Sequence, residues 1–250
     1  MKHLPVLACM ALCTLAGVHA QNPILKDTFA DADSETPLAG HIPEVGEGKW
    51  VAPAEAKIIH SGDDAYVSNG EASHGIATVP MTADVAKSGF TIRAKVRSVP
   101  LTFNDQLSWI ALLVKNESPG SFNSPSTEYI GILFHFRNSG FVGYSVVSSP
   151  KEVELAGIPP LEQFKTHAAS ACQPWNEEKF NDVVFSYDPA KHAFSISVNG
   201  YDVFANEPIK FPEQMPTDGL NQFQIAWHGG EEDIASSDRR VGPVTVTPLR

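Results

Sequence analysis

The chain has 250 residues, of which 42% are hydrophobic and 19% charged, so it is long enough to build one domain around its own hydrophobic core. Its 29 Asp and Glu residues outnumber its 18 Lys and Arg residues and give a formal net charge of −11 at pH 7. A surface of that sign repels phosphate backbones, so we expect no nucleic-acid partner, whereas neutral glycans meet no such penalty.

The first twenty residues have the layout of a secretory signal peptide. Lys2 and His3 precede an apolar stretch over residues 4–15, and residues 18–20 place small side chains at the cleavage positions. The stretch is too short to span a bilayer, and the longest later apolar run covers only residues 109–114. We therefore expect cleavage after Ala20, a secreted or periplasmic location, no membrane span, and a single domain over residues 21–250.

Beyond the leader, apolar and polar residues alternate in short runs separated by Gly, Pro and Asn. This period of two is typical of β-strands with one face on a core and the other in water. Helical periodicity is almost absent, and we expect at most one short helical turn, within residues 160–169. The predicted strands cover residues 58–59, 75–79, 90–96, 107–115, 128–137, 141–148, 181–187, 193–199, 202–204, 221–228 and 241–247.

The segment from Val183 to Phe204 carries the clearest turn signals. A Pro-containing turn at residues 188–191 separates two alternating runs, and Asn199-Gly200 follows the second run. Asn-Gly favours a two-residue hairpin turn because both residues tolerate a positive φ. Strands of this number and length predict an all-β protein, a two-sheet antiparallel β-sandwich or jelly roll.

Three segments resemble bacterial secreted concanavalin A-like (LamG-like jelly-roll) domains. Residues 26–29 (KDTF), 37–41 (PLAGH) and 48–50 (GKW) are similar to the opening of such domains. Residues 180–204 resemble their paired strands, and residues 241–247 resemble the last strand, which returns beside the first. The resemblance covers the chain from about residue 24 onward and implies a concanavalin A-like fold. Its motifs are structural, and the superfamily includes lectins, carbohydrate-binding modules, glycoside hydrolases and polysaccharide lyases.

The strand over residues 128–137 is the best candidate for a functional face. Its inward row would be Ile130, Ile132, Phe134 and Phe136, and its outward row Tyr129, Gly131, Leu133, His135 and Arg137. The outward row predicts a glycan platform in which Tyr129 stacks on a sugar, while His135 and Arg137 bond its hydroxyls or a carboxylate. The alternative is an ordinary solvated face.

The strand over residues 221–228 repeats this pattern. Phe223, Ile225 and Trp227 alternate with a polar row that contains Gln224 and His228. If both strands share a sheet, their polar rows converge. Trp109 and Trp227 lie in apolar runs and read as core, and Trp50 reads as an aromatic plug at a strand entrance. Trp175, between Pro174 and Asn176, is a candidate stacking residue.

Enzymatic chemistry finds weaker support in the sequence. A glycosidase needs two carboxylates at a fixed separation. Glu152 and Glu154 have strand spacing but lie between prolines, and residues 231–233 read as a solvated acidic loop. A lyase needs a cation and a His or Tyr base, which Arg137, His135 and Tyr144 would supply without a recognisable motif. We predict no catalytic residues.

The sequence also contains few residues suited to metal binding or to thiol chemistry. The sequence has no His-x-His or His-Glu-x-x-His array, so zinc is not expected. Calcium is the one possible cofactor, through oxygens of Asp27, Asp63 and Asp64, although no complete binding loop is present. Cys172 is the only cysteine after the leader, which precludes an internal disulfide and suggests a small buried side chain.

These observations predict an exported β-sandwich that recognises a polysaccharide or glycan without catalysis. The alternatives are a glycoside hydrolase or lyase that uses the same face, and a cell-envelope structural domain without a small ligand. The sequence does not define an oligomeric state. The predicted ligand-binding residues are Tyr129, His135, Arg137, Tyr144, Trp175, Gln224 and His228.

Overall fold

The computed structural model describes most of the chain after residue 20, and within that part it contains β-strands and no α-helix. The expected leader, residues 1–20, lies outside the described residues. No helix in the described part has the length and apolar character needed to cross a membrane. The described residues are 21–69, 74–98, 108–117, 127–136, 142–148, 165–171, 175–176, 178–210, 212, 215–228 and 239–250.

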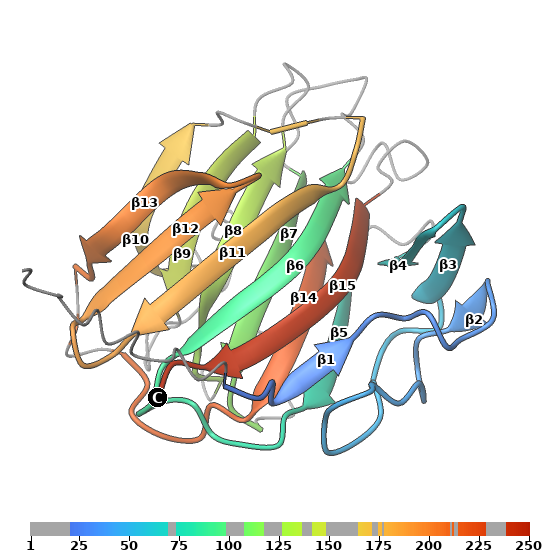
Figure 1. Cartoon of the computed structure of the whole chain (residues 1–250), viewed down its shortest axis with the longest axis horizontal. Coiled ribbons are helices and arrows are strands. Elements are labelled where there is room, and N and C mark those ends of the chain that lie inside the picture. The colour runs from blue at the N-terminus through green and yellow to red at the C-terminus, as the bar shows by residue number, and fades with distance from the viewer. Residues whose placement is uncertain are drawn as a thin grey trace, which may run out of the picture.

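The strands form two antiparallel sheets that lie face to face (Figure 1). Strand β1 (Leu25–Asp27) joins the larger sheet by pairing with β15. The nine-stranded sheet has the order β13 (Tyr201–Pro208), β12 (Ala193–Val198), β11 (Asn181–Asp188), β6 (Phe90–Ser98), β15 (Arg239–Pro248), β4 (Asp64–Ser68), β3 (Lys57–Ser61) and β2 (Thr36–Pro37). The six-stranded sheet has the order β10 (Lys165–Ala171), β9 (Val142–Ser148), β8 (Tyr129–Phe136), β7 (Ser108–Lys115), β14 (Gln222–His228) and β5 (His74–Pro80).

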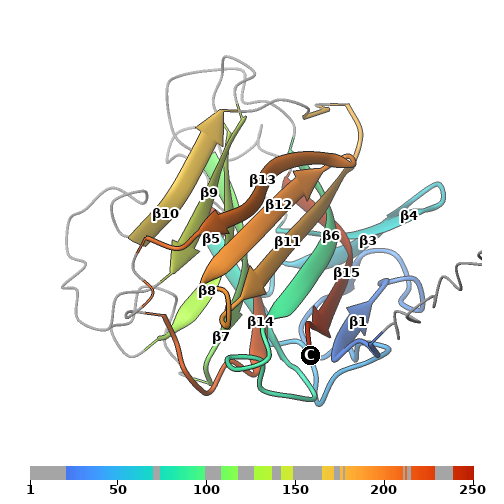
Figure 2. The same ribbon diagram turned by 60° about the vertical axis from the view of Figure 1, so that its left-hand side comes forward.

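The main core fills the space between these sheets, which Figure 2 shows as two layers. Ile130, Ile132 and Phe134 of β8 belong to it, as the alternation of their strand predicts. Ile92 and Phe185 contribute from the opposite sheet. Full burial of one such side chain stabilises the fold by about 1.5–3 kcal/mol, so this layer is the main source of stability. The all-β, two-sheet prediction is confirmed.

The predicted turns around β12 are confirmed. The Asp188 Oδ1 atom accepts hydrogen bonds from the backbone N–H groups of Ala190 and Lys191 at 3.1 and 3.3 Å. Asn199 and Gly200 have φ angles of 52° and 81°, as a tight turn between β12 and β13 requires. The pairing of the first and last strands that the resemblance implies is also present, with Leu25 opposite Val246.

Four strands were not predicted: β1, β2, β4 and β10. The expectation of a helical turn is wrong over residues 165–169, because β10 occupies residues 165–171 and pairs with β9. Residues 160–164 lie outside the described part of the chain. Strand β10 lacks apolar alternation, and it forms at the sheet edge, where pairing along one neighbour overrides local preference.

Candidate ligand-binding site

Strands β8 and β14 lie in the same sheet, on either side of β7. On β14, Phe223, Ile225 and Trp227 belong to the main core, so the alternating residues occupy the opposite face. We call this face, turned away from the nine-stranded sheet, the outer face. The two polar rows expected from the sequence therefore share one face, separated by a single strand, or about 10 Å between β8 and β14.

One register row of the outer face carries three histidines. Trp109 on β7 is the Cα partner of His135 on β8 and of His228 on β14. His228 is in turn the Cα partner of His74 on the edge strand β5. We call these four positions the histidine row. His74 is exposed and Trp109 is 1% exposed, so the row runs from the solvent edge toward a buried centre.

The middle of the outer face is buried, so neither an open glycan platform at Tyr129 nor the alternative of an ordinary solvated face describes it. Tyr129 is 2% exposed, and burial raises the pKa of its hydroxyl far above the ordinary range. Its Cα partner on β7 is the buried Lys115, and the rest of that strand from residue 109 to 114 is apolar on both faces, which is typical of a strand buried on both sides. The apolar run over residues 109–114 was the sequence signal for this burial. The residues of this second hydrophobic cluster are Trp109, Ala111, Leu113, Tyr129, Leu133, Val147 and Ala226.

Gly131 leaves no open gap for a sugar ring. A Cβ atom at this position would lie 2.9 Å from Cδ2 of Leu113 and 2.0 Å from the Leu112 carbonyl oxygen. The neighbouring strand therefore occupies the space that the missing side chain frees. Glycine is required here by close packing, and the position does not contribute a binding hollow.

Gln224 is the most unusual polar residue of the outer face. It is 0% exposed, and its Cα partners are Thr78 on β5 and Leu113 on β7. Within the described part of the chain, neither Oε1 nor Nε2 of its amide has a hydrogen-bond partner. Leaving a buried polar group unpaired costs about 1–3 kcal/mol, so this amide is a strong candidate to bind a polar group from outside the chain.

Gln224 lies one strand from the β5 edge of the sheet. Thr78 is half-buried, and it forms a bridge with Val51, which is 69% exposed. The register row Val51, Thr78, Gln224 thus passes from solvent to a buried amide across two strand spacings, about 10 Å. A second polar side chain of this face, Lys115, is 2% exposed, and burial lowers the pKa of its ammonium group.

Tyr144 and Trp175 do not lie on this face. Tyr144 is the Cα partner of Phe134, which faces the main core, so it occupies an inward register position. His135 and Tyr144, two of the three residues considered for a lyase, therefore occupy register positions on opposite faces of the sheet. Trp175 is half-buried and packs its ring 5.7 Å from that of Phe134. Arg137, Cys172, Glu152, Glu154 and residues 231–233 lie outside the described residues.

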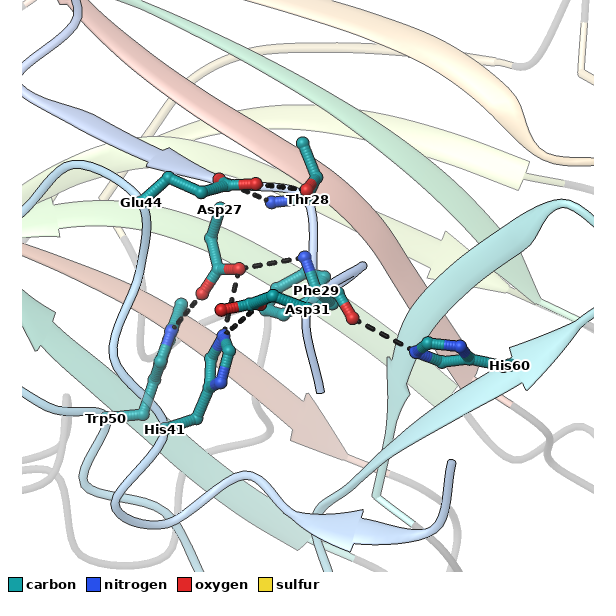
Figure 3. Close-up of polar contacts among 8 residues, drawn as sticks. All are labelled: Asp27, Thr28, Phe29, Asp31, His41, Glu44, Trp50 and His60. Atoms are coloured by element: carbon teal, nitrogen blue, oxygen red, sulfur yellow. Dashed lines mark hydrogen bonds and ion pairs between the residues drawn. The ribbon is translucent and has the colours of Figure 1, made fainter. Parts of the chain in front are cut away.

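A separate polar cluster surrounds Asp27 at the end of β1 (Figure 3). Asp27 is 0% exposed; its Oδ2 atom accepts the indole N–H of Trp50 at 2.7 Å. Its Oδ1 atom accepts the backbone N–H of Phe29 at 2.8 Å and the Nε2–H of His41 at 3.1 Å. Burial raises the pKa of Asp27, and these hydrogen bonds oppose that shift without reversing it.

This cluster explains the opening motif of the sequence. Asp27 and Phe29 come from KDTF, His41 closes PLAGH, and Trp50 closes GKW, so three separated segments meet at one carboxylate. Trp50 also packs edge-on against Phe223 of β14, with ring centroids 6.2 Å apart. The motif thus fastens β1 and the following loop to the sandwich.

The cluster does not resemble a calcium site. Both carboxylate oxygens of Asp27 accept hydrogen bonds, and Asp64 lies 3.9 Å from the Lys95 ammonium group. Among the described residues, no three or more His, Cys, Asp and Glu side chains are grouped so that they could hold a metal ion. Because Ca²⁺ takes six to eight oxygen ligands, Asp27, Asp63 and Asp64 do not form a calcium site by themselves.

The described fold is similar to solved lectin structures. The carbohydrate recognition domain of Emp47p matches with a TM-score of 0.57 and 12% identity, over 90% of this chain and 97% of that one. The chain has a concanavalin A-like β-sandwich fold. The metal-free carbohydrate recognition domain of Emp46p matches this concanavalin A-like chain with a TM-score of 0.53 and 11% identity, covering 79% and 87% of the two chains.

A third match is winged bean acidic lectin complexed with methyl-α-D-galactose, with a TM-score of 0.50 and 13% identity over 79% of this chain and 91% of that one. No protein-family model matches the chain, and no curated protein matches it. At these identities the likeness establishes the concanavalin A-like fold, and the function has to be argued from the site.

Proposed function

We propose that this concanavalin A-like domain binds a carbohydrate without catalysis, and that the sugar contacts the outer face of the six-stranded sheet at Gln224. The fold supports this, because Emp47p and Emp46p match through their carbohydrate recognition domains. The observation that carries the proposal is the fully buried Gln224 amide, which lacks a partner within the described residues.

The chemistry of a carboxamide fits a sugar. Its oxygen accepts and its nitrogen donates, and neighbouring sugar hydroxyls do both, so one amide can bond two hydroxyls. Thr78 adds a hydroxyl in the same register row, and Val51 adds exposed apolar surface for the CH face of a ring. A neutral glycan also suits a protein of net charge −11.

His135 and His228 are proposed as further contacts, on the same face as Gln224. His228 lies on the same strand as Gln224, four residues further along, about 13 Å away. A ligand that reaches both residues would span more than one sugar ring. We therefore propose an oligosaccharide or polysaccharide chain, lying along β14, as the ligand.

The test is a glycan array with the full chain, followed by calorimetry with the best ligand. Gln224→Leu should weaken binding at least about tenfold, because it removes hydrogen bonds worth about 1–3 kcal/mol while keeping the side-chain volume. Ser197→Ala, on the far side of the nine-stranded sheet, is the matched control and should bind as wild type.

Two results would contradict the proposal. Absence of binding to every glycan on the array would remove the carbohydrate function itself. Equal affinity of the wild type and the Gln224→Leu variant would place the site elsewhere on the molecule. Release of reducing sugars or unsaturated products from a bound polysaccharide would contradict the non-catalytic part and favour the hydrolase or lyase alternative.

A further inference from the structure

A register row with three basic residues crosses four neighbouring strands of the nine-stranded sheet. Arg240 on β15 is the Cα partner of Arg97 on β6 and of Ser68 on β4. Ser68 is in turn the Cα partner of Lys57 on β3. Directly opposed residues of antiparallel strands lie on one face of the sheet, so these four side chains share a face. We call these four positions the cationic row.

The cationic row lies on the outside of the sandwich. Each member has a sequence neighbour in the main core, and these neighbours are, in the order of the strands β6, β15, β4 and β3, Val96, Val241, Val67 and Ile58. Because side chains alternate across a strand, the row faces away from the six-stranded sheet, on the opposite side of the molecule from Gln224. Lys57 is exposed, and Arg97 and Arg240 are half-buried. The row spans three strand spacings, about 14 Å.

The strands that carry the row offer little negative charge to balance it. Strands β2, β3, β4, β15 and β6 contain one acidic residue, Asp64. Its carboxylate lies 3.9 Å from Nζ of Lys95, two residues before Arg97 on β6. Asp182 of β11 is the Cα partner of the same lysine. The acids of this face thus gather at Lys95, and the row itself is a positive strip on a chain of net charge −11.

Two guanidinium groups stand side by side in this strip. Arg97 and Arg240 are directly opposed, which places their Cβ atoms about 4.5–5.5 Å apart. Like charges opposed in this way destabilise a sheet, and an anion bound between them would offset the repulsion. The guanidinium of Arg240 lies 4.6 Å from the ring centroid of Tyr66, a cation–π contact that fixes its position. Within the described part of the chain, the buried Nε of Arg97 has no hydrogen-bond partner.

This arrangement suits oxyanions. An arginine side chain donates parallel N–H groups that match two oxygens of one anionic group, and a lysine adds a mobile point charge. We propose that Arg97, Arg240 and Lys57 bind the carboxylate or sulfate groups of an anionic glycan chain that lies across β6, β15, β4 and β3. This inference is independent of the proposed sugar contact at Gln224, since it rests on different side chains in the other sheet.

Two other classes of anionic partner fit the row less well. Tight protein partners bury apolar anchors, and the exposed large hydrophobic side chains of the described part, Ile42, Val51 and Tyr201, do not lie on these four strands. A single nucleic-acid strand stacks its bases on exposed rings, but Tyr66 is 5% exposed and lies beneath Arg240. A glycan chain needs neither kind of contact, so charge complementarity alone can hold it.

The test is calorimetry of the full chain at low salt with polygalacturonate, dextran sulfate and uncharged dextran. We expect at least one of the two polyanions to bind, with an affinity that falls as salt is added, because exposed ionic contacts are screened. Uncharged dextran should not bind at this site. Comparison of the two polyanions distinguishes a carboxylate ligand from a sulfate ligand, and inorganic sulfate as a competitor distinguishes a chain from a free ion.

Single-residue variants locate the site. Arg97→Gln and Arg240→Gln should each weaken polyanion binding at least about tenfold, because each removes charge-assisted hydrogen bonds. Arg97→Lys keeps the charge without the paired donors and should lose less, as should Lys57→Gln at the exposed end of the row. Lys191→Gln is the matched control: it removes the same charge from the same sheet, in the β11–β12 turn, where Nζ lies 3.2 Å from Asp188. This control should bind as wild type.

Failure of both polyanions to bind would overturn the proposal, as would wild-type affinity of Arg97→Gln. An equal loss in Lys191→Gln would also overturn it, because binding would then follow net charge alone. Displacement of the chain by inorganic sulfate at an equal concentration of charged groups, or equally tight binding of duplex DNA, would overturn the assignment to a glycan.

Two further measurements keep the result interpretable. If circular dichroism shows that Arg240→Gln does not fold, Arg97→Gln and Lys57→Gln decide. Gln224→Leu should bind the polyanions as wild type, whereas Arg97→Gln should leave the binding of neutral glycans unchanged. The failure of one proposal is therefore distinguishable from the failure of the other.

Discussion

Trp50 donates its indole N–H to Oδ2 of Asp27 across 2.7 Å, and both side chains are almost completely buried. This bond joins the end of β1 to a loop residue whose ring also packs on Phe223 of the six-stranded sheet. Asp27 accepts a further backbone N–H from Phe29 and a ring N–H from His41. The carboxylate thus connects the N-terminal strand to both layers of the sandwich.

Asp27→Asn should destabilise the protein at neutral pH by about 1–3 kcal/mol. Both carboxylate oxygens accept N–H groups, and the new amide would turn an N–H₂ group toward one of these donors. Urea unfolding measures the change. Asp31→Asn is the control, because Asp31 is 63% exposed and lies 3.9 Å from His41. Equal stability of Asp27→Asn and wild type would mean that relief of carboxylate burial offsets the lost bonds.

The free energy of unfolding should depend on pH because the carboxyl group of Asp27 is buried. Burial raises its pKa above the ordinary 3.8, so above that pH the folded chain keeps a proton that the unfolded chain has lost. The contribution of this group to the free energy of unfolding is therefore fully present below pH 3.8 and falls as the pH rises through the raised pKa.

Unfolding measured at several pH values, for the wild type and Asp27→Asn, checks this sign. The stability of the wild type relative to the variant should decrease as the pH rises from 3.8, and Asp31→Asn should show no such trend. A relative stability that increases with pH would mean that the hydrogen bonds lower the pKa of Asp27 more than burial raises it.

Alanine substitutions at Gly89 and Gly200 distinguish the cost of backbone strain from the cost of a steric clash. Both have positive φ, 71° and 81°. An added Cβ at Gly200 meets nothing within 4 Å, whereas at Gly89 it would lie 2.3 Å from the Tyr187 carbonyl oxygen and 2.7 Å from Cδ of Pro189. Gly200→Ala should cost about 1–2 kcal/mol for the left-handed backbone alone.

Gly89→Ala should be clearly more destabilising than Gly200→Ala, because the clash is with backbone and a rigid ring. Thermal and urea unfolding of the two variants give the comparison. Similar losses in both would show that the β6 entrance moves enough to accommodate a methyl group.

Local sequence signals predicted the strands and turns well, but they did not predict which strands pair with one another. Asn199-Gly200 specifies its turn through its own backbone preferences, and the rows Ile130 to Phe134 and Phe223 to Trp227 point inward as their alternation indicates. Alternation does not say which strands are neighbours. The Cα pairing of His74 with His228, for example, exists only through the β5–β14 register.

Burial of the outer face was missed for a different reason. A polar row on one strand was interpreted without its neighbours, and β8 lies beside β7, whose outer row is apolar from Trp109 to Leu113. The run over residues 109–114 contained that information. The Asp27 cluster was only half predicted: the motif residues were recognised as structural, but their meeting at one carboxylate depends on the loop path between them.

Gln224→Leu should leave the free energy of unfolding unchanged or increase it by up to about 1–3 kcal/mol. Within the described residues the buried amide has no hydrogen-bond partner, so its burial costs free energy that an apolar side chain of similar size would not incur. Gln222→Leu, on the same face and strand but half-buried, is the control and should change stability little.

The direction of this change bears on the proposed function. A variant that is more stable but no longer binds glycan would show that the Gln224 amide is retained for binding at the expense of stability. A clear loss of stability would mean instead that the amide is already satisfied in the free protein, for example by a buried water molecule. Urea unfolding of both variants, with and without the bound glycan, separates these cases, since only a satisfied amide makes Gln224→Leu costly when no ligand is present.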